Sequence, residues 1–178
     1  MPPRAVLVGL PGTGKSTVGA RLARRLSLPF ADSDRLVAER AGRSVSEIFE
    51  QDGEPAFRQL EAETIGQALA GFDGILALGG GAVTTEAVRV ELGAAGVPVV
   101  LLTADQDELL HRMAGARHRP LLAGDPAGRL AELSRQRDRL YREVATLTVP
   151  TGGRSVAQVT ERVFGQLTRT GRSTAGPR

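Results

Sequence analysis

The sequence predicts an α/β protein of three layers, in which a mostly parallel, five-stranded central sheet is covered by helices on both faces. Short apolar runs of strand length alternate with segments in which apolar residues recur at helical spacing. The first apolar run is followed by a glycine-rich turn and then by a helix, which is the order that a phosphate-binding loop requires. A chain of 178 residues is long enough for one such domain with a substantial core.

Five apolar runs are expected to be the strands, at 5–8, 28–31, 75–78, 97–102 and 145–149. Helices are expected at 15–26, 35–41, 44–69, 84–92, 103–113, 129–144 and 155–167. Gly42 is expected to end a helix, Ser44 to begin the next with a capping box, and Thr84 to cap another. Glycine and proline at 52–55 predict a break in the helix that contains them. We expect residues 1–168 to form one domain and residues 169–178 to be a disordered tail.

The stretch from Gly9 to Thr17 matches the phosphate-binding pattern G-x-x-x-x-G-K-[ST]. Its glycines let backbone N–H groups point inward around phosphate oxygens, and the N-terminus of the following helix adds partial positive charge. Lys15 is placed to reach the outer phosphates of a nucleotide, and the hydroxyl of Ser16 is placed to bind Mg²⁺. Lys15 is the sole lysine of an arginine-rich chain, which indicates that this position requires a compact ammonium group.

The composition excludes several kinds of site and partner. There are no cysteines, so disulfides, thiolate-bound zinc and a thiol nucleophile are excluded. The formal charge is only +3, and the sequence pI is about 10.4 because the basic residues are nearly all arginine. Acidic residues are interspersed with these arginines and aromatic residues are only 3%, which argues against nucleic-acid binding. We expect a cytoplasmic monomer with no nucleic-acid or membrane partner.

The carboxyl ends of the predicted strands are expected to meet in one crevice, because ligands bind there in such sheets. Asp32-Ser33-Asp34 follow the second strand. If the chain stays extended, Asp32 and Asp34 point to opposite sides, so that Asp32 faces Mg²⁺ and Asp34 faces a substrate. Alternatively one of them caps the next helix, which we expect more of Asp34 than of Asp32. Gly79-Gly80-Gly81 follow the third strand and suit a close approach of backbone N–H groups to a ligand.

Phe49, Phe57, Arg58 and Glu61 lie in one helical segment. Arg58 and Glu61 are spaced i,i+3, which is compatible with a surface ion pair. Glu61 could equally orient Arg58 so that both arms of the guanidinium bind a carboxylate. The composition leaves both interpretations open.

The stretch 115–128 loses helical periodicity and contains glycine, proline and arginine. Within a compact domain such a segment is typical of a mobile lid, which we place at about 114–126. Lids bring arginines onto transferring phosphates and exclude water, and the candidates are Arg117, Arg119 and Arg137. For any one arginine the alternative is a solvated helix face.

Two classes of nucleotide-binding protein do not fit. A GTPase needs a second lysine in its guanine-reading motif, and the chain has none. A motor ATPase needs an acidic residue after the strand at 75–78, where glycine stands. The nearest alternatives are small-molecule kinases for gluconate or for a nucleoside monophosphate, although Ser16 stands where adenylate kinases usually have glycine.

Taken together, these residues resemble the shikimate kinase family, and closely its actinobacterial form, from residue 6 to about 154. The matching segments are 9–17, 32–34, 53–54, 57–58, Glu61, 79–83, 119–122, Arg137 and 140–141. The phosphate-binding loop alone is shared with many unrelated NTPases, whereas this set in this order is highly specific. The resemblance implies transfer of a phosphoryl group from ATP to the 3-hydroxyl of shikimate, on the route to chorismate and the aromatic amino acids.

The resemblance also implies the residues that bind each ligand. The ATP-binding residues would be Gly12, Thr13, Gly14, Lys15, Ser16, Thr17, Arg119 and Arg154. One Mg²⁺ would bind with ATP near Ser16 and Asp32. The shikimate-binding residues would be Pro11, Asp34, Phe49, Phe57, Arg58, Glu61, Gly79, Gly80, Gly81 and Arg137.

The catalytic residues implied are Asp34, Lys15 and Arg119, with Asp34 as the proposed base. Arg58 and Arg137 would hold the substrate carboxylate, with the N–H of Gly80 as a further donor. Two positions depart from the family pattern. Ala77 stands where a serine often precedes the glycines, and Ser155-Val156 stand where an Asn-Pro-like pair is expected near the adenine.

Overall fold

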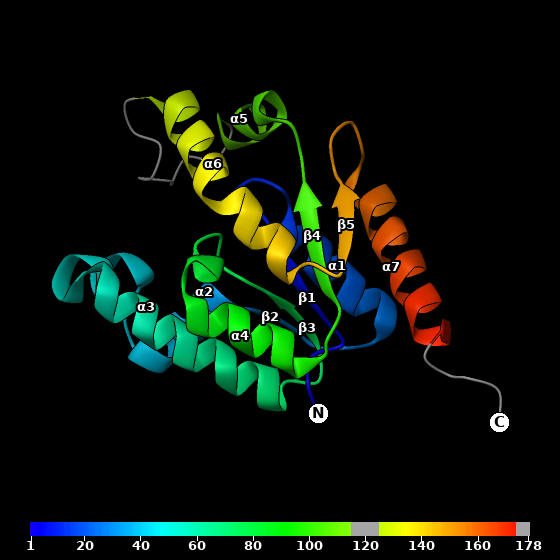
Figure 1. Cartoon of the computed structure of the whole chain (residues 1–178), viewed down its shortest axis with the longest axis horizontal. Helices are drawn as coiled ribbons and strands as arrows, with labels where there is room; N and C mark the ends of the chain where they lie inside the picture. Colours follow the sequence, from blue (N-terminus) through cyan, green and yellow to red (C-terminus); the bar gives the residue numbers. More distant parts are fainter. Residues whose placement is uncertain (115–124, 174–178) are drawn as a thin grey trace.

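The computed structural model of the chain describes residues 1–114 and 125–173, and within them five strands form one parallel sheet (Figure 1). The strands are β1 (Ala5–Val8), β2 (Phe30–Asp32), β3 (Ile75–Ala77), β4 (Val99–Thr103) and β5 (Leu147–Pro150). Their order across the sheet is β2-β3-β1-β4-β5, and Val6 pairs with Leu76 on one side and Val99 on the other. The predicted five-stranded sheet is confirmed, and every strand pair in it is parallel.

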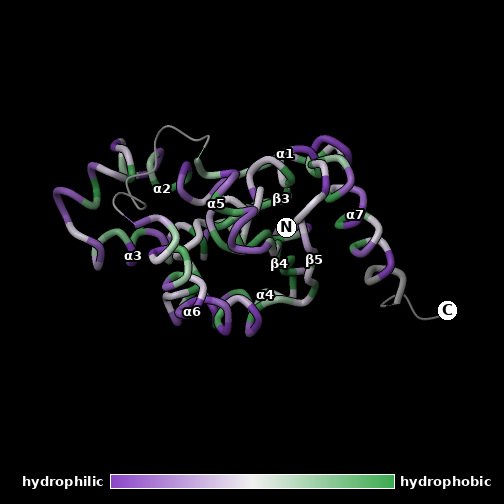
Figure 2. Tube along the Cα trace, turned by 90° about the horizontal axis from the view of Figure 1, so that it is seen from above, coloured by the Kyte–Doolittle hydropathy of each residue, from purple (hydrophilic) through white to green (hydrophobic). Residues whose placement is uncertain are grey.

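The helices are α1 (Lys15–Leu26), α2 (Ser33–Ala41), α3 (Val45–Gly71), α4 (Glu86–Ala95), α5 (Gln106–Ala114), α6 (Pro126–Val144) and α7 (Val156–Ser173). A short 3₁₀ helix, η1 (Ala82–Thr84), follows β3. Figure 2 shows α1 on one side of the strands and α4 and α6 on the other. The helices therefore form two outer layers around the sheet, as predicted.

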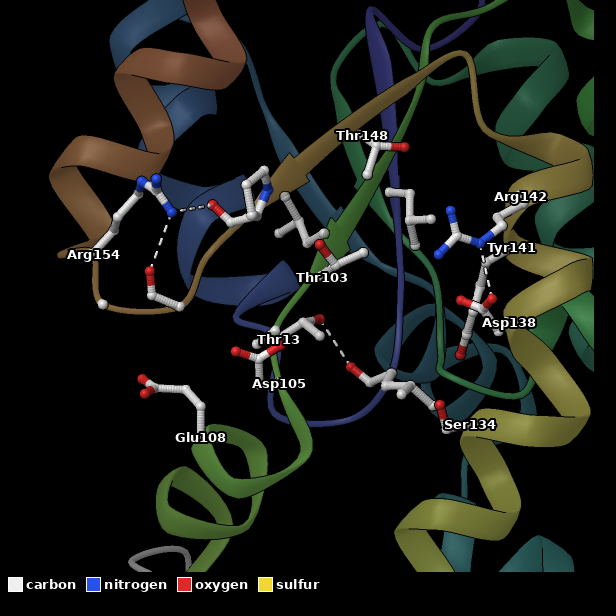
Figure 3. A pocket seen from close by; sticks show the side chains of 17 residues that line it. Thr13, Thr103, Asp105, Glu108, Ser134, Asp138, Tyr141, Arg142, Thr148 and Arg154 are labelled. Carbon is white, nitrogen blue, oxygen red and sulfur yellow. Dashed lines mark hydrogen bonds and ion pairs between the residues drawn. The ribbon is translucent and has the colours of Figure 1, made fainter.

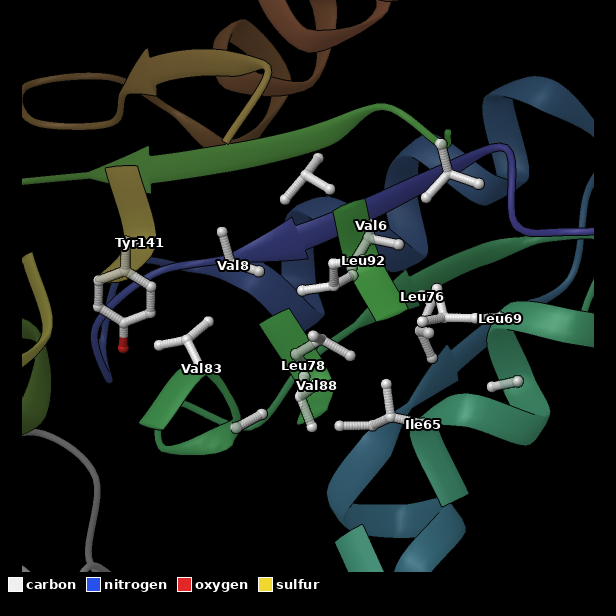
Figure 4. Packing of buried hydrophobic residues seen from close by; sticks show 14 of the residues in the cluster. Val6, Val8, Ile65, Leu69, Leu76, Leu78, Val83, Val88, Leu92 and Tyr141 are labelled. Carbon is white, nitrogen blue, oxygen red and sulfur yellow. The ribbon is translucent and has the colours of Figure 1, made fainter. Parts of the chain in front are cut away.

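Side chains of β1 alternate between the two faces of the sheet, as the pleat requires. Ala5 and Leu7 pack in one apolar cluster with residues of α1 and α7. Val6 and Val8 pack in another, which includes residues of α3, α4 and α6 (Figure 4). All four side chains are buried, because a parallel sheet covered on both faces leaves no strand face to solvent.

Two helix boundaries and one break form as predicted. Gly42 ends α2 with φ 65°, and Ser44 begins α3 with a complete capping box to Glu47. Gly53 interrupts α3 with φ 81° and ψ 169°, a conformation that favours glycine, and Pro55 follows it. This break turns the first part of α3 back against α2, where Val37, Ile48 and Phe57 form a separate buried cluster.

Predicted boundaries of α4, α6 and α7 are wrong. Thr85, rather than Thr84, precedes α4, because Thr84 lies in η1 and donates its hydroxyl to the Gly81 carbonyl at 2.7 Å. Helix α6 begins at Pro126, three residues earlier than predicted, because the Asp125 side chain accepts from the Gly128 N–H and proline suits the first helical position. Helix α7 continues to Ser173, so residues 169–173, predicted to be disordered, are helical.

Candidate active site

The carboxyl ends of β1, β2 and β3 bring together segments that are far apart in the sequence. The glycine turn, residues 79–81, is the centre of this arrangement. The space where a Cβ would lie on Gly79 is taken by the carboxylates of Asp34 and Glu61, and on Gly81 by the guanidinium of Arg58. On Gly80 a Cβ would lie 3.2 Å from Cδ of Pro11 in the phosphate-binding loop. The predicted meeting of the ends of β1, β2 and β3 is confirmed, and the absence of side chains on the turn allows it.

The phosphate-binding loop has the strained backbone that its glycines permit. Gly9, Gly12 and Gly14 have φ of 143°, 85° and 91°, in the region that favours glycine. Lys15 begins α1, and its Nζ donates to the carbonyls of Gly9 at 2.8 Å and Leu10 at 3.1 Å. The ammonium group is thereby held over the loop, beside the N-terminus of α1, where anions bind favourably.

A cavity of about 410 Å³ opens above this loop. The predicted ATP-binding residues that line it are Gly12, Thr13, Gly14, Lys15, Ser16, Thr17 and Arg154. The remaining one, Arg119, and most of the predicted lid, fall on residues 115–124, outside the described residues. Glu108, Arg112, Met113, Val156 and Val159 also line the cavity and were not predicted to do so, although Val156 was placed near the adenine.

Arg112 is the most connected residue that sequence reasoning missed. Its guanidinium donates to the hydroxyl and the carbonyl of Thr151, each at 3.0 Å, to the Gly12 carbonyl at 3.4 Å, and to Glu108 at 2.9 Å. It therefore joins α5, the phosphate-binding loop and the loop after β5. The i,i+4 spacing from Glu108 was the available signal, but such pairs usually lie on solvated helix faces.

Arg154 lies where this cavity meets a second one of about 520 Å³, lined by residues of β4, β5 and α6 (Figure 3). Its Nη1 donates to the carbonyls of Pro150 at 3.3 Å and Gly152 at 3.1 Å. These bonds hold the loop after β5 in a compact turn around the Arg154 side chain. Contact of Arg154 with ATP near the adenine stays a prediction.

Ser16 and Asp32, the two residues predicted to bind Mg²⁺, are in direct contact. The Ser16 hydroxyl donates to Oδ2 of Asp32 at 2.6 Å, and Oδ1 of Asp32 accepts from the Asp34 N–H at 3.1 Å. Asp32 is thus the N-cap of α2, and the expectation that Asp34 was the better cap is wrong, because the chain turns into helix directly after β2. Two oxygen ligands beside a phosphate site fit Mg²⁺, which keeps several waters and binds phosphate oxygens.

Arg58 and Glu61 form a buried ion pair rather than a surface one. Arg58 Nη1 lies 2.7 Å from a Glu61 oxygen, and the Glu61 side chain is 1% exposed. Burial raises the pKa of Glu61, Arg58 opposes that rise, and the Asp34 carboxylate adds to it. Glu54 holds Arg58 from the other side at 3.1 Å. The guanidinium therefore has a fixed orientation beside the glycine turn.

Arg137, on α6, reaches the same turn from the opposite side. Its Nη1 donates to the Gly80 carbonyl at 3.0 Å, while its Nε is buried without a hydrogen-bond acceptor within the described residues. Within residues 1–114 and 125–173, the N–H groups of Gly80 and Gly81 also have no acceptor. A buried donor without an acceptor is costly, so the Nε of Arg137 favours an anionic ligand beside the turn, where the N–H groups of Gly80 and Gly81 could also donate.

Phe49 and Phe57 pack against each other, and Phe57 lies beside Arg58. Their ring centroids lie 4.4 Å apart, and Phe57 is 3% exposed within the α2–α3 cluster. The Arg58 guanidinium carbon lies 5.2 Å from the centroid of Phe57. Direct contact of either ring with a substrate stays a prediction.

The family model described as "Shikimate kinase" matches residues 11–168. This chain belongs to the shikimate kinase family. The shikimate kinase of Rhodococcus jostii is 48% identical over 168 residues, which cover 94% of this chain and 99% of the relative. That of Mycobacterium tuberculosis is 46% identical over 168 residues, covering 94% of each chain.

Solved structures agree with this family. Shikimate kinase from Acinetobacter baumannii, in complex with shikimate, superposes with a TM-score of 0.88 at 33% identity, covering 96% of this chain and 94% of that one. A gluconokinase from Sinorhizobium meliloti has a TM-score of 0.72 at 21% identity, covering 97% and 95%, and so shares the fold alone. Among the described helices of this shikimate kinase family member, none is long and apolar enough to cross a membrane.

Proposed function

We propose that this chain transfers the γ-phosphoryl group of ATP to the 3-hydroxyl of shikimate, with Mg²⁺, and that the two halves of the site hold the two substrates. The observation that carries the proposal is the glycine turn. Pro11 of the nucleotide half, the Asp34 carboxylate and the Arg58 guanidinium lie within 3.2 Å of where Cβ atoms on its glycines would be, so all three line the turn. An acceptor bound at this turn lies next to the phosphates of a nucleotide on the loop.

The acceptor half suits a carboxylate that also carries hydroxyl groups. Arg58 and the unpaired Nε–H of Arg137 supply positive charge and directed donors, and the N–H groups of Gly80 and Gly81 add two more. Arginine binds carboxylates with both arms, which fixes the ligand as well as attracting it. Asp34 lies at the other end of the turn, where it can accept from hydroxyl groups.

In the reaction, the acceptor hydroxyl oxygen forms a bond to the γ-phosphorus while the bond from that phosphorus to the bridging oxygen of ADP breaks. Asp34 orients the hydroxyl and accepts its proton as the transfer proceeds. Lys15 exchanges the loop carbonyls for the phosphate oxygens and stabilises their charge. Such transfer asks the protein mainly for positioning and charge stabilisation.

Ser16 and Asp32 would hold Mg²⁺ on the nucleotide side. The ion would neutralise charge on the phosphates and help to align them. Arg119, in the predicted lid, is proposed to bind the ATP phosphates.

A coupled ADP-release assay with Mg-ATP and each of shikimate, gluconate and AMP tests the proposal. We expect turnover with shikimate and none above background with the other two. Gluconate is the most informative alternative acceptor, because a gluconokinase shares this fold. Turnover with gluconate alone would exclude shikimate as the acceptor.

A further inference from the structure

Tyr141 is the sole tyrosine of the chain and takes no part in the mechanism above. It lies on α6 and is 2% exposed, packed in the apolar cluster that also contains Val8 and Val83 (Figure 4). Its hydroxyl donates to the Gly80 carbonyl at 2.5 Å. The Gly80 carbonyl therefore accepts from two side chains of α6, Tyr141 and Arg137.

The glycine turn has a defined type. The Gly79 carbonyl accepts from the Ala82 N–H at 3.1 Å, which closes a four-residue turn. Gly81, its third residue, has φ −95° and ψ −10°, and Gly80 does not have positive φ. The Gly81 angles are those of the third residue of a type I turn, whereas a type II turn needs positive φ at that residue. With glycine at the third position, a type II turn is also sterically open, and the two types differ by a flip of the central peptide.

That central peptide joins the Gly80 carbonyl to the Gly81 N–H. Because the peptide is planar and trans, the two groups point in opposite directions. While the carbonyl points to Tyr141 and Arg137, the N–H points away from these two side chains. Gly81 itself lies beside Arg58, whose guanidinium takes the place of a Cβ there. In a flipped turn the carbonyl oxygen, which carries partial negative charge, would face the place proposed for the substrate carboxylate.

We infer that Tyr141 is a positioning residue for the acceptor. By holding the Gly80 carbonyl, it keeps the turn in the form that presents an N–H, rather than a C=O, to the carboxylate. The inference rests on the proposed function, since it concerns the carboxylate of that acceptor. Arg137 also donates to this carbonyl through Nη1, but its Nε–H is the group proposed to bind the ligand, so Tyr141 is the donor that serves the carbonyl alone.

The start of the turn is held separately. The Gly79 N–H donates to the hydroxyl of Ser33 at 2.8 Å, and Ser33 is fully buried. This bond is the same in type I and type II turns, so Ser33 anchors the turn to α2 without selecting its type. Selection is therefore assigned to Tyr141.

The test is Tyr141→Phe, which keeps the ring and its packing and removes only the hydroxyl. Dissociation constants are measured by calorimetry for ATP, for shikimate, and for the analogue in which a hydroxymethyl group replaces the carboxylate. We expect shikimate to bind about 5- to 20-fold more weakly, as loss of one buried hydrogen bond implies, with the analogue and ATP changed less than about twofold.

Thr160→Val is the matched control, because Thr160 is 1% exposed and its hydroxyl makes one backbone hydrogen bond, on α7 across the sheet. It should leave shikimate affinity unchanged. Unchanged shikimate affinity in Tyr141→Phe would overturn the inference. Equal weakening of shikimate binding and analogue binding would also overturn it, because it would indicate a general loosening of the acceptor site. Failure of the unmodified protein to bind or phosphorylate shikimate would instead overturn the proposed function.

Discussion

The nucleotide half and the acceptor half of the site are built in different ways. The nucleotide half is centred on one continuous segment, the loop from Gly9 to Thr17, whose proposed ligand groups are mainly backbone N–H groups and one helix N-terminus. The acceptor half takes Asp34 from α2, Arg58 from α3, the glycine turn and Arg137 from α6. A local motif specifies the first, whereas only the packing of three helices against the sheet creates the second.

The two halves also use their cations differently. Lys15 donates to carbonyls of its own loop, which can be exchanged for phosphate oxygens. Arg58 is fixed by Glu61, which is 1% exposed, and by Glu54. A compact ammonium suits a site crowded with phosphate oxygens, and a planar guanidinium suits a carboxylate. The comparison therefore predicts that the two cations are not interchangeable.

The largest expected effect comes from Asp34→Asn, at the junction of the halves. We expect kcat to fall by about 10²- to 10⁴-fold, since the amide cannot accept the proton, with ATP affinity within about twofold. Steady-state kinetics with shikimate and calorimetry with ATP measure both. Asp73→Asn is the control, because Asp73 pairs with Arg4 before β3, at the amino ends of the strands, opposite the glycine turn. A loss of less than tenfold would show that Asp34 is not the base.

Lys15→Arg tests the nucleotide half alone. We expect kcat/KM to fall by about 10²- to 10³-fold, because the larger guanidinium does not fit the position of a point charge on the phosphates. Shikimate affinity in the absence of nucleotide should stay within about twofold. Near-normal turnover would mean that any cation suffices at this loop.

Arg58→Lys is the reciprocal test of the acceptor half. We expect KM for shikimate to rise by about 10- to 100-fold, because an ammonium cannot make the bidentate contact or keep both glutamate contacts. KM for ATP should be near normal. Arg40→Lys, in an exposed pair with Glu63, is the control and should change neither constant. The assigned role of Arg58 is wrong if KM for shikimate does not change.

The last prediction concerns ionisation of Tyr141, which has the smallest effect at neutral pH because the phenol is neutral there. Burial raises the pKa of Tyr141 from 10.0 to about 12. Stability that depends on the neutral phenol is complete below pH 10.0 and is lost as pH rises through about 12. The loss is about 2–3 kcal/mol at the upper end.

The chain has one tyrosine and no tryptophan, so phenolate absorbance reports this group alone. We expect ionisation near pH 12, together with weakening of the fold measured by denaturant unfolding. Ionisation near pH 10 in the folded protein would contradict the buried position of the hydroxyl.

Much of the fold was predictable because its signals are local. Apolar runs predicted all five strands, and the capping box at Ser44 and the break at Gly53 were read correctly. The errors arise where the signal is ambiguous. Asp125-Pro126 looked like loop composition, although an aspartate followed by proline is also a helix start.

The acceptor site was only partly predictable. Asp34, Arg58 and the glycine turn were named from the sequence, and the structure brings them together. Arg112 and the role of Tyr141 were missed, because an arginine or tyrosine in a helical pattern gives no sign of which backbone carbonyl it will meet. In an arginine-rich chain, most such residues lie on solvated faces.

The sequence by itself determined the strands, the phosphate-binding loop and its single lysine, because backbone conformation and helix starts depend on neighbouring residues. Only the tertiary structure decided that Asp32 caps α2, that Glu61 is buried against Arg58, and that α6 holds the glycine turn in one form. These outcomes depend on contacts between segments far apart in the chain. Burial and the direction of a peptide plane exist only once those segments have packed together.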